Sequence, residues 1–326
     1  MTIFELRMIY TTYRSILFTF LALILVSAAT KAQPLPDGQE SLSVSAQSFA
    51  LEVPDQPDLV GGHLQGIQLH NGTLIVSGSS KQFGYLALYQ LLGGEFKFLG
   101  IKKLATDALT HAGGFQVSSN WLAVGVEDPV GKRESVIQLI DVSSYESISG
   151  PPAYSLKRRG EFKRSTAGAV ALLKRKDHFL LAVGGWDCTN IDLYRSNHLD
   201  PKKADFEFTL WTSWDSREAI KKGWISRSYG NYQNLQFSED STGLYLTGLG
   251  RTSNGSNQAD VFKLMVNSDP YHLLKKVGTY SVQCTGSVTF RNGAGLTDFF
   301  GVPSIIAVGH DLYPKTQVQI FPIKQD

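Results

Sequence analysis

The chain has 326 residues, with 31 Lys and Arg, 29 Asp and Glu, and a formal net charge of +2. This balance disfavours a uniformly basic protein that binds nucleic acid or an anionic membrane surface. With 42% hydrophobic residues and two cysteines, the chain is long enough for a large β domain and is not a disulfide-stapled mini-protein.

Residues 1–32 have the pattern of a secretory signal peptide. Arg7 and Arg14 precede an apolar stretch over residues 16–29, and small residues follow as far as Ala32. The apolar stretch is shorter than the roughly 20 residues that a membrane-spanning helix needs, so a signal anchor is the weaker alternative. We therefore expect cleavage after Ala32, a secreted protein in an extracellular or periplasmic location, and no integral membrane span afterwards. Cleavage removes three basic residues and one acid, which leaves the mature chain close to neutral.

Residues 33–47 are expected to form an N-terminal linker and residues 48–326 a single domain, within which three kinds of segment recur. The inner segment occurs as HLQGIQL from His63, HAGGFQV from His111, STAGAVA from Ser165, NYQNLQF from Asn231 and QCTGSVT from Gln283. Second segments begin at Leu74, Leu122, Leu181, Tyr245 and Ile306, and third segments begin at Tyr85, Ser135, Asn190, Asp260 and Thr316.

These segments are rich in Val, Ile, Leu, Tyr and Phe, often alternate at period two, and are separated by Gly, Asn, Asp and Pro, which predicts strands and turns. A weaker fourth segment closes most units, and only SREAIKKGW from Ser216 has a helical pattern. Four antiparallel strands repeated at this spacing are typical of a propeller blade. The last unit ends after three strands, and a strand over 48–53 would supply its outer one.

The pattern thus resembles five-bladed β-propellers as a group, over the whole mature chain. The resemblance implies an all-β fold of five blades, each with four antiparallel strands, in which the N-terminal strand closes the last blade. Several such propellers are sugar-binding lectins or glycoside hydrolases, so the resemblance implies work on glycans. It points to no specific family.

In a four-stranded blade, the inner strand begins and the second strand ends on the same face, here expected to be the mouth of a central channel. The inner strands contribute His63, His111, Ser165, Asn231 and Gln283 to this face. The second strands contribute Ser79, Ser80, Glu127, Asp128, Trp186, Asp187, Arg251, His310 and Asp311. Such polar residues can equally serve the structure by bonding to a neighbouring blade, as we expect for Gln68, Gln116 and Gln236.

Tryptophans provide a second indication of a ligand site. The segment WTSWDSREAIKKGWISRSYG crosses the same face and is predicted to bring Trp214 and Trp224 near Trp186, where flat aromatic rings suit sugar rings. The predicted ligand-binding residues are His63, Trp186, Trp214, Trp224, Arg251, His310, Asp311 and Asn231.

Catalysis on this face is the alternative to binding alone. A glycosidase needs two carboxyl groups about 5–9.5 Å apart, which Glu127 and Asp187 from adjacent blades could provide. His111 and Asp128 are further candidates for an acid, a base or a ligand. A metal site of His63, His111 and His310 is a weaker alternative, because the close spacing of a zinc motif is missing.

Three functions remain open at this point: binding of a small polar ligand or glycan, hydrolysis of one, or a protein-interaction scaffold without catalysis. The sequence identifies no cofactor. Cys188 and Cys284 could form a disulfide or remain two buried thiols.

Overall fold

The computed structural model describes residues 38–42, 45–104, 108–225, 229–266 and 270–323. The described residues form one compact unit. The expected signal peptide, residues 1–32, lies outside the described residues. In the part of the chain that is described, no helix is both long and apolar enough to cross a membrane.

Antiparallel meanders make up almost the whole unit. The first comprises β3 (His63–His70), β4 (Thr73–Ser79), β5 (Gly84–Leu92) and β6 (Glu95–Leu104). Next come β7 (His111–Ser118), β8 (Trp121–Glu127), β9 (Glu134–Asp141) and β10 (Tyr154–Arg159), and then β11 (Ala169–Lys174), β12 (Phe179–Gly184), β13 (Asn190–Ser196) and β14 (Phe208–Asp215). A parallel pairing of Ala169 with Gly114 joins these two meanders into one eight-stranded sheet.

The remaining strands form two further sheets. One contains β15 (Asn231–Asp240), β16 (Gly243–Arg251), β17 (Asn257–Leu264) and β18 (Leu274–Val282), with β1 (Gly38–Leu42) added at its edge. The other contains β19 (Ala294–Phe299), β20 (Val302–Val308), β21 (Lys315–Pro322) and β2 (Gln47–Glu52). Short helices are α2 (Tyr145–Ser149), α3 (Ser216–Lys221), η1 (Pro57–Leu59), η2 (Trp186–Cys188) and η3 (Pro270–His272).

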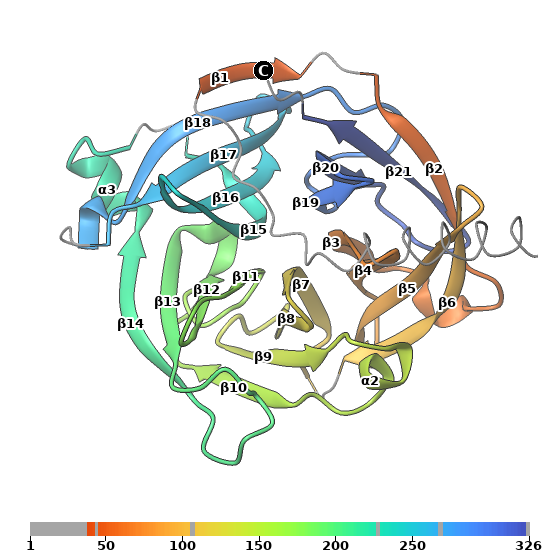
Figure 1. Cartoon of the computed structure of the whole chain (residues 1–326), viewed down its shortest axis with the longest axis horizontal. Coiled ribbons are helices and arrows are strands. Elements are labelled where there is room, and N and C mark those ends of the chain that lie inside the picture. The colour runs from red at the N-terminus through yellow and green to blue at the C-terminus, as the bar shows by residue number, and fades with distance from the viewer. Residues whose placement is uncertain (1–37, 43–44, 105–107, 226–228, 267–269, 324–326) are drawn as a thin grey trace, which may run out of the picture. The chain divides into compact units, whose positions relative to one another are not determined.

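The sheets are arranged around a central axis with β3, β7, β11, β15 and β19 innermost, as Figure 1 shows. Second strands such as β12 are buried along their whole length because sheets cover both of their faces. Outer strands such as β2 instead alternate between covered and exposed residues. The fold is a β-propeller, as the repeat predicts.

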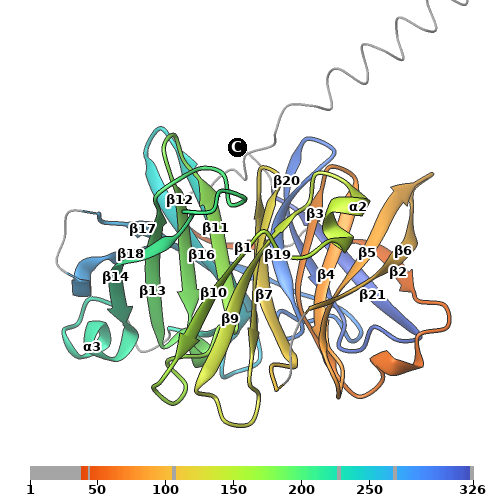
Figure 2. The same ribbon diagram turned by 90° about the horizontal axis from the view of Figure 1, so that it is seen from below.

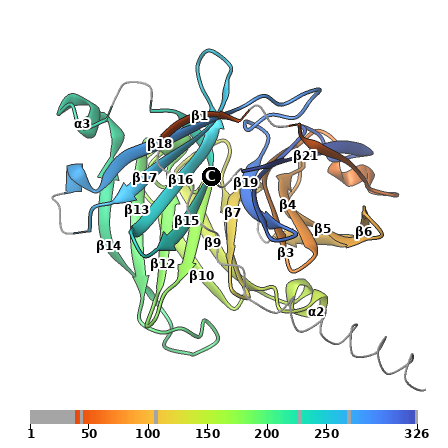
Figure 3. The same ribbon diagram turned by 45° about the horizontal axis from the view of Figure 1, so that its top comes forward.

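The N-terminal strand completes the last sheet, as expected. β2 pairs antiparallel with β21, from Gln47 opposite Ile320 to Glu52 opposite Lys315, so strands from both ends of the chain lie side by side (Figure 1). The predicted linker is not entirely irregular, because β1 within it pairs in parallel with β18 (Figure 3).

Two of the predicted inner strands were placed wrongly. β11 begins at Ala169 rather than at Ser165, and β19 begins at Ala294 rather than at Gln283. The segment from Gln283 is rich in polar residues and Gly and forms turns, whereas the later AGLTDF provides the apolar side chains of the inner strand. In these two units the motif that defines the inner segment lies in a loop. Alignment on that motif therefore gives the wrong starts for β11 and β19.

The hydrophobic core is divided into clusters, each between two neighbouring four-stranded units. Cys188 belongs to the cluster between β11–β14 and β15–β18, and Cys284 packs against a different cluster. Both are free thiols, so the alternative of a disulfide between them is wrong.

Glutamine side chains tie the inner strands together. Gln68 Oε1 accepts a hydrogen bond from Val117 N at 2.8 Å, which links β3 to β7. Gln236 Oε1 accepts one from Leu296 N, which links β15 to β19. These bonds confirm the predicted role of the recurring glutamines, since they satisfy buried backbone groups that the strands leave unpaired.

Gln116 of β7 reaches across the axis. Its Oε1 accepts hydrogen bonds from Leu172 N at 3.1 Å and Phe237 N at 2.8 Å, and its Nε2 donates to Phe237 O at 2.8 Å. One side chain thus joins β7 to both β11 and β15. The inner strands are thus bridged by a side chain at this level.

Candidate functional site

The site face is the side of the unit at which β3, β7 and β15 begin and at which β4, β8 and β16 end. Register pairs place His63 opposite Ser79, His111 opposite Glu127 and Asn231 opposite Arg251 at this face. In Figure 2, α3 lies at this end of the strands and α2 at the opposite end. The sequence argument for a shared face is therefore correct.

Three inner strands carry an irregularity just after they begin. The register shifts between Leu64 and Gly66 in β3, between Ala112 and Phe115 in β7, and between Tyr232 and Asn234 in β15. Such bulges redirect side chains and are frequent next to active sites. The bulged strands also approach closely, because a Cβ atom on Gly114 would lie 2.3 Å from Gln233 O.

The bulge in β3 directs Gln65 toward two histidines. Gln65 Nε2 lies 2.5 Å from His63 Nε2 and 3.1 Å from His111 Nε2. The two histidine Nε2 atoms lie 3.1 Å from each other. We call these three residues the histidine cluster.

Glu127 lies beneath this cluster with only 1% of its surface exposed. Its Oε2 accepts a hydrogen bond from Ala167 N at 2.7 Å, and its Oε1 lies 3.1 Å from His111 Nδ1. The second contact is within ion-pair distance but lies off the line of a hydrogen bond. Glu127 thus orients the His111 ring so that Nε2 faces the cluster.

His310 lies on the outer side of the histidine cluster, with its ring stacked on His63 at a centroid distance of 5.9 Å. Burial lowers the pKa of His63 to about 4, and the charges of His111, His310 and Arg291 act in the same direction against Asp311. His63 is therefore neutral at physiological pH.

The predicted metal set is only partly assembled. His63, His111 and His310 do lie together, but no group of three or more His, Cys, Asp and Glu side chains in the described ranges is placed to hold a metal ion. His310 instead contacts its neighbour Asp311, with Nδ1 2.9 Å from Oδ1.

A second group surrounds Trp186. Lys132 Nζ lies 3.5 Å from the centre of the Trp186 ring, and Lys163 Nζ lies 6.0 Å from it. The loops are joined through their backbones, since Lys163 N donates to Lys132 O at 2.7 Å and Trp186 N donates to Lys163 O at 2.9 Å. We call Trp186, Lys132 and Lys163 the aromatic platform.

The turn after Trp186 is strained. Asp187 and Cys188 have φ values of 57° and 51°, in the left-handed region that non-glycine residues avoid. The turn is held by Cys188 N, which donates to Gly185 O at 2.8 Å, and by Tyr229 Oη, which donates to Cys188 O at 2.8 Å. Strain that the surroundings impose in this way is concentrated at functional sites.

The strained turn brings Asp187 within electrostatic range of Glu127 and of the two platform lysines. Burial raises the pKa of the Asp187 carboxyl, and the nearby Glu127 charge adds to this effect, while Lys163 and Lys132 oppose it. Two carboxyl groups in unlike surroundings therefore lie near each other, one fully buried and hydrogen-bonded and the other half-buried with a raised pKa.

We expect Asp187→Asn to increase thermal stability at pH 7. The folded state raises the Asp187 pKa above its unfolded value, so the ionised carboxylate weakens folding, and an uncharged amide removes that penalty. The wild type has its full stability below the unfolded pKa of Asp187 and loses part of it as pH rises through the folded pKa. The difference in Tm between variant and wild type should therefore shrink as pH is lowered toward 4. Asp240→Asn is the matched control of opposite sign, because hydrogen bonds from Thr242 lower the pKa of Asp240. A Tm difference that does not change with pH would contradict the assignment.

Two predicted ligand residues belong elsewhere. Trp214 is 1% exposed and part of the hydrophobic core between two sheets, so its assignment to a binding wall is wrong. Trp224 is half-buried against the same core, and its Nε1 donates to Leu274 O at 2.6 Å in the outer strand β18. Both positions result from the path of β14 and α3, which run outward and carry the two tryptophans away from the axis.

Asp128, Arg251 and Asn231 also lie on the site face, and Asp128 O accepts a hydrogen bond from Lys132 N of the aromatic platform at 3.2 Å. Asp128 Oδ1 accepts hydrogen bonds from Val130 N and Gly131 N at 2.8 and 2.9 Å, so it stabilises a turn. Arg251 Nε donates to Gly255 O at 2.8 Å, and Asn231 is exposed opposite it.

Sequence reasoning missed Gln65, Lys132 and Lys163. The Gly after Gln65 is a signal for a bulge within a strand, and it would have pointed to that residue. The lysines lie in the loops that follow β8 and β10, whereas the prediction considered only the residues at strand ends.

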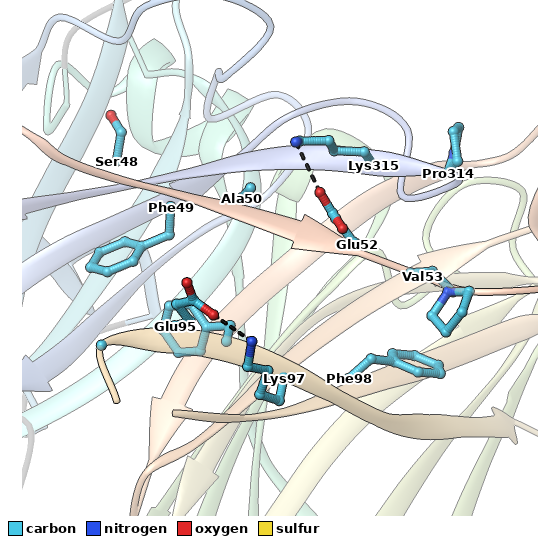
Figure 4. A pocket seen from close by; sticks show the side chains of 13 residues that line it. Ser48, Phe49, Ala50, Glu52, Val53, Glu95, Lys97, Phe98, Pro314 and Lys315 are labelled. Atoms are coloured by element: carbon cyan, nitrogen blue, oxygen red, sulfur yellow. Dashed lines mark hydrogen bonds and ion pairs between the residues drawn. The ribbon is translucent and has the colours of Figure 1, made fainter. Parts of the chain in front are cut away.

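A cavity of about 1030 Å³ lies elsewhere, between the outer strands β2 and β6 (Figure 4). Phe49 and Phe96 form its apolar part, with ring centroids 5.2 Å apart, and Lys315 pairs with Glu52 at its edge at 2.9 Å. None of the predicted site residues lines this cavity.

Comparison with known proteins provides information on the fold alone. No protein-family model and no curated protein sequence matches the chain. Among solved structures, GH43 protein BlXynB from Bacillus licheniformis is 9% identical with a TM-score of 0.50, covering 86% of this chain and 55% of its own. GH32 β-fructofuranosidase BmSUC1 from Bombyx mori is 11% identical with a TM-score of 0.47, covering 83% and 62%. A GH43_1 enzyme from Xanthomonas citri is 10% identical with a TM-score of 0.46, covering 83% and 90%. The chain thus spans less than two thirds of the length of the first two.

Proposed function

We propose that the protein is an exported, five-bladed β-propeller that binds a carbohydrate or a similar polar ligand on its site face. The observation that carries the ligand proposal is the aromatic platform, which presents a half-buried tryptophan and two lysines beside a strained carboxylate turn.

The number of blades is inferred from the strand pairing. The eight-stranded sheet counts as two blades because a pairing of Ala169 with Gly114 joins two otherwise complete antiparallel meanders. Four blades then consist of the four strands of one meander. The fifth consists of β19, β20 and β21 together with β2 from the N-terminal side, which closes the ring. The core clusters support this count, since each lies between two such neighbours.

The platform suits a ligand that combines a flat apolar face with polar groups at its edge. Trp186 offers ring surface, while Lys132, Lys163 and Asp187 offer charged hydrogen-bonding groups around it. Because backbone hydrogen bonds join the loops that carry them, little ordering entropy remains to be lost on binding.

We expect Trp186→Ala to lower the affinity for the best oligosaccharide by at least about 10-fold, as for other aromatic anchors. The measurement is calorimetric titration after screening a panel of neutral and acidic oligosaccharides. Trp121→Ala is the matched control, because Trp121 is also half-buried beneath a lysine, with Lys202 Nζ 5.6 Å from its ring centre, but begins β8 at the opposite face. Equal losses in both variants, or no binder in the panel, would overturn the proposal.

A hydrolase is the second candidate, favoured by the unlike surroundings of Glu127 and Asp187. Pairs of carboxyl groups whose environments separate their pKa values can serve as acid and base. In this role Asp187 is the proton donor, and Glu127 acts on the substrate or through His111. The solved structure with a TM-score of 0.50 is a GH43 protein, and its likeness concerns the fold alone. Sugar turnover by wild type that Glu127→Gln and Asp187→Asn both abolish would favour this candidate over binding alone.

Export rests on the signal-peptide pattern of residues 1–32. We infer an extracellular or periplasmic location from it. A neutral mature surface and a polar ligand site are compatible with that location.

A further inference from the structure

Three positively charged side chains gather at the aromatic platform without acidic partners. Lys132 and Arg133 lie in the loop after β8, and Lys163 lies in the loop after β10. In the described ranges none of the three takes part in an ion pair. The arginines close to them in the sequence are paired with acids, namely Arg158, Arg159 and Arg164. We call Lys132, Arg133 and Lys163 the platform cations.

Aromatic rings hold the platform cations close together. Lys132 Nζ lies 3.5 Å from the centre of the Trp186 ring. Arg133 Cζ and Lys163 Nζ lie 5.7 and 5.6 Å from the centre of the Phe162 ring, which is 53% exposed. The faces of the rings attract the cations, whereas the cations repel one another. A bound anion would relieve that repulsion.

The backbones of the two loops are fixed in a strained arrangement. Lys132 and Lys163 have φ values of 53° and 64°, in the left-handed region that residues other than glycine avoid. Hydrogen bonds hold the loops against each other, since Lys163 N donates to Lys132 O at 2.7 Å and Gly160 N donates to Arg133 O at 3.0 Å. The platform cations are therefore positioned before any ligand binds.

Most acids of these loops are engaged elsewhere. Glu134 Oε1 pairs with Arg159 at 2.6 Å, Glu161 pairs with Arg164 at 3.7 Å, and Asp128 accepts the turn hydrogen bonds described above. Asp187 is half-buried and within electrostatic range of Lys132 and Lys163, so it offsets part of their charge. The platform is locally positive, although the mature chain is close to neutral.

A neutral sugar makes little use of this arrangement. It has no charge to match the platform cations, and the Lys132 ammonium group already covers one face of the Trp186 ring. We propose that the ligand of the site face is an acidic glycan, whose carboxylate or sulfate group binds between the platform cations while a sugar ring packs on Phe162. Asp187 accepts hydrogen bonds from its hydroxyl groups. This inference rests on the proposed carbohydrate binding and adds the charge of the ligand.

The test is calorimetric titration of the full chain with two matched pairs of glycans. One pair is an oligogalacturonate and its methyl ester, and the other is dextran sulfate and dextran. We expect the acidic member of a pair to bind at least about 10-fold more tightly than the neutral one, with a preference that weakens as salt is added. A preference within the first pair identifies a carboxylate ligand, and one within the second identifies a sulfate ester. Either result supports the proposal.

Variants of the platform cations locate the site. Lys132→Met, Arg133→Met and Lys163→Met should each weaken binding of the acidic glycan by about 5- to 10-fold, the effect of losing one charge-assisted hydrogen bond. Lys263→Met is the matched control, because Lys263 is a half-buried lysine with Nζ 5.9 Å from the centre of the Tyr245 ring, near the opposite end of β16. It removes the same charge and should leave the affinity unchanged. Far-ultraviolet circular dichroism checks that each variant is folded.

The outcomes separate this inference from the proposed function. Equal binding of the acidic and neutral glycans, unchanged in all three cation variants, overturns the acidic ligand and leaves carbohydrate binding standing. No binding of any of the four glycans overturns both. A DNA oligonucleotide that binds as tightly as the acidic glycan also overturns the inference, since it would show attraction of any polyanion. The comparison of acidic and neutral glycans uses the wild type, so it remains decisive even if a variant does not fold.

Discussion

Gln116→Leu is expected to lower the free energy of unfolding by about 3–5 kcal/mol. The substitution leaves Leu172 N, Phe237 N and Phe237 O without the partner that the amide provides, and an orphaned buried group costs about 1–3 kcal/mol. Urea-induced unfolding followed by tryptophan fluorescence measures the change.

Gln138→Leu is the control for this experiment. Gln138 of β9 is 3% exposed, similar to 2% for Gln116, but in the described structure its Oε1 has no hydrogen-bond partner. Replacing it should change stability by no more than about 1 kcal/mol and can increase it, because an unsatisfied polar group is removed. Equal destabilisation in the two variants would show that the bonds across the axis are not what stabilises the propeller.

Trp214→Ala should have an effect of similar size for a different reason. Trp214 is one of the largest fully buried side chains, and its ring lies 5.2 Å from that of Tyr229, so truncation opens a cavity in the core between two sheets. A loss of about 3–5 kcal/mol is expected for such a change. Thermal and urea unfolding provide the measurement.

The milder variant Trp214→Phe separates the core role from the binding wall that the sequence predicted. It fills most of the volume, so we expect a folded protein with unchanged oligosaccharide affinity. Lost affinity with preserved stability would instead restore Trp214 to the ligand site. Trp186→Phe is the comparison, since at the platform it should affect binding more than stability.

The repeat pattern predicts which residues of the site share a face, but not the distances between them. That His63, His111 and Glu127 share one face follows from the hairpin connections, because the start of one strand must lie opposite the end of the next. That His111 lies 3.1 Å from both His63 and Glu127 does not follow from the pattern. It depends on bulges in β3 and β7, which turn Gln65 and the histidines toward one point.

The tryptophans show what the sequence pattern cannot predict. Trp186, Trp214 and Trp224 were grouped because the segments that carry them reach the same face, and only Trp186 remained. The sequence does not show how far from the axis a long connection runs. Outer strand β14 and helix α3 bury their aromatic residues against the neighbouring sheet, where apolar area is available.

The sequence by itself determined the β-propeller, the completion of the last sheet by an N-terminal strand, the role of the recurring glutamines and the face that carries the polar residues. These features depend on period-two alternation and on repeats, which are local properties of the chain. Only the tertiary structure decided where β11 and β19 begin, that the axis is crossed by Gln116, and that Gln65, Lys132 and Lys163 complete the candidate site. Those features depend on contacts between sheets, where backbone bulges and packing volume select among positions that the local pattern leaves equivalent.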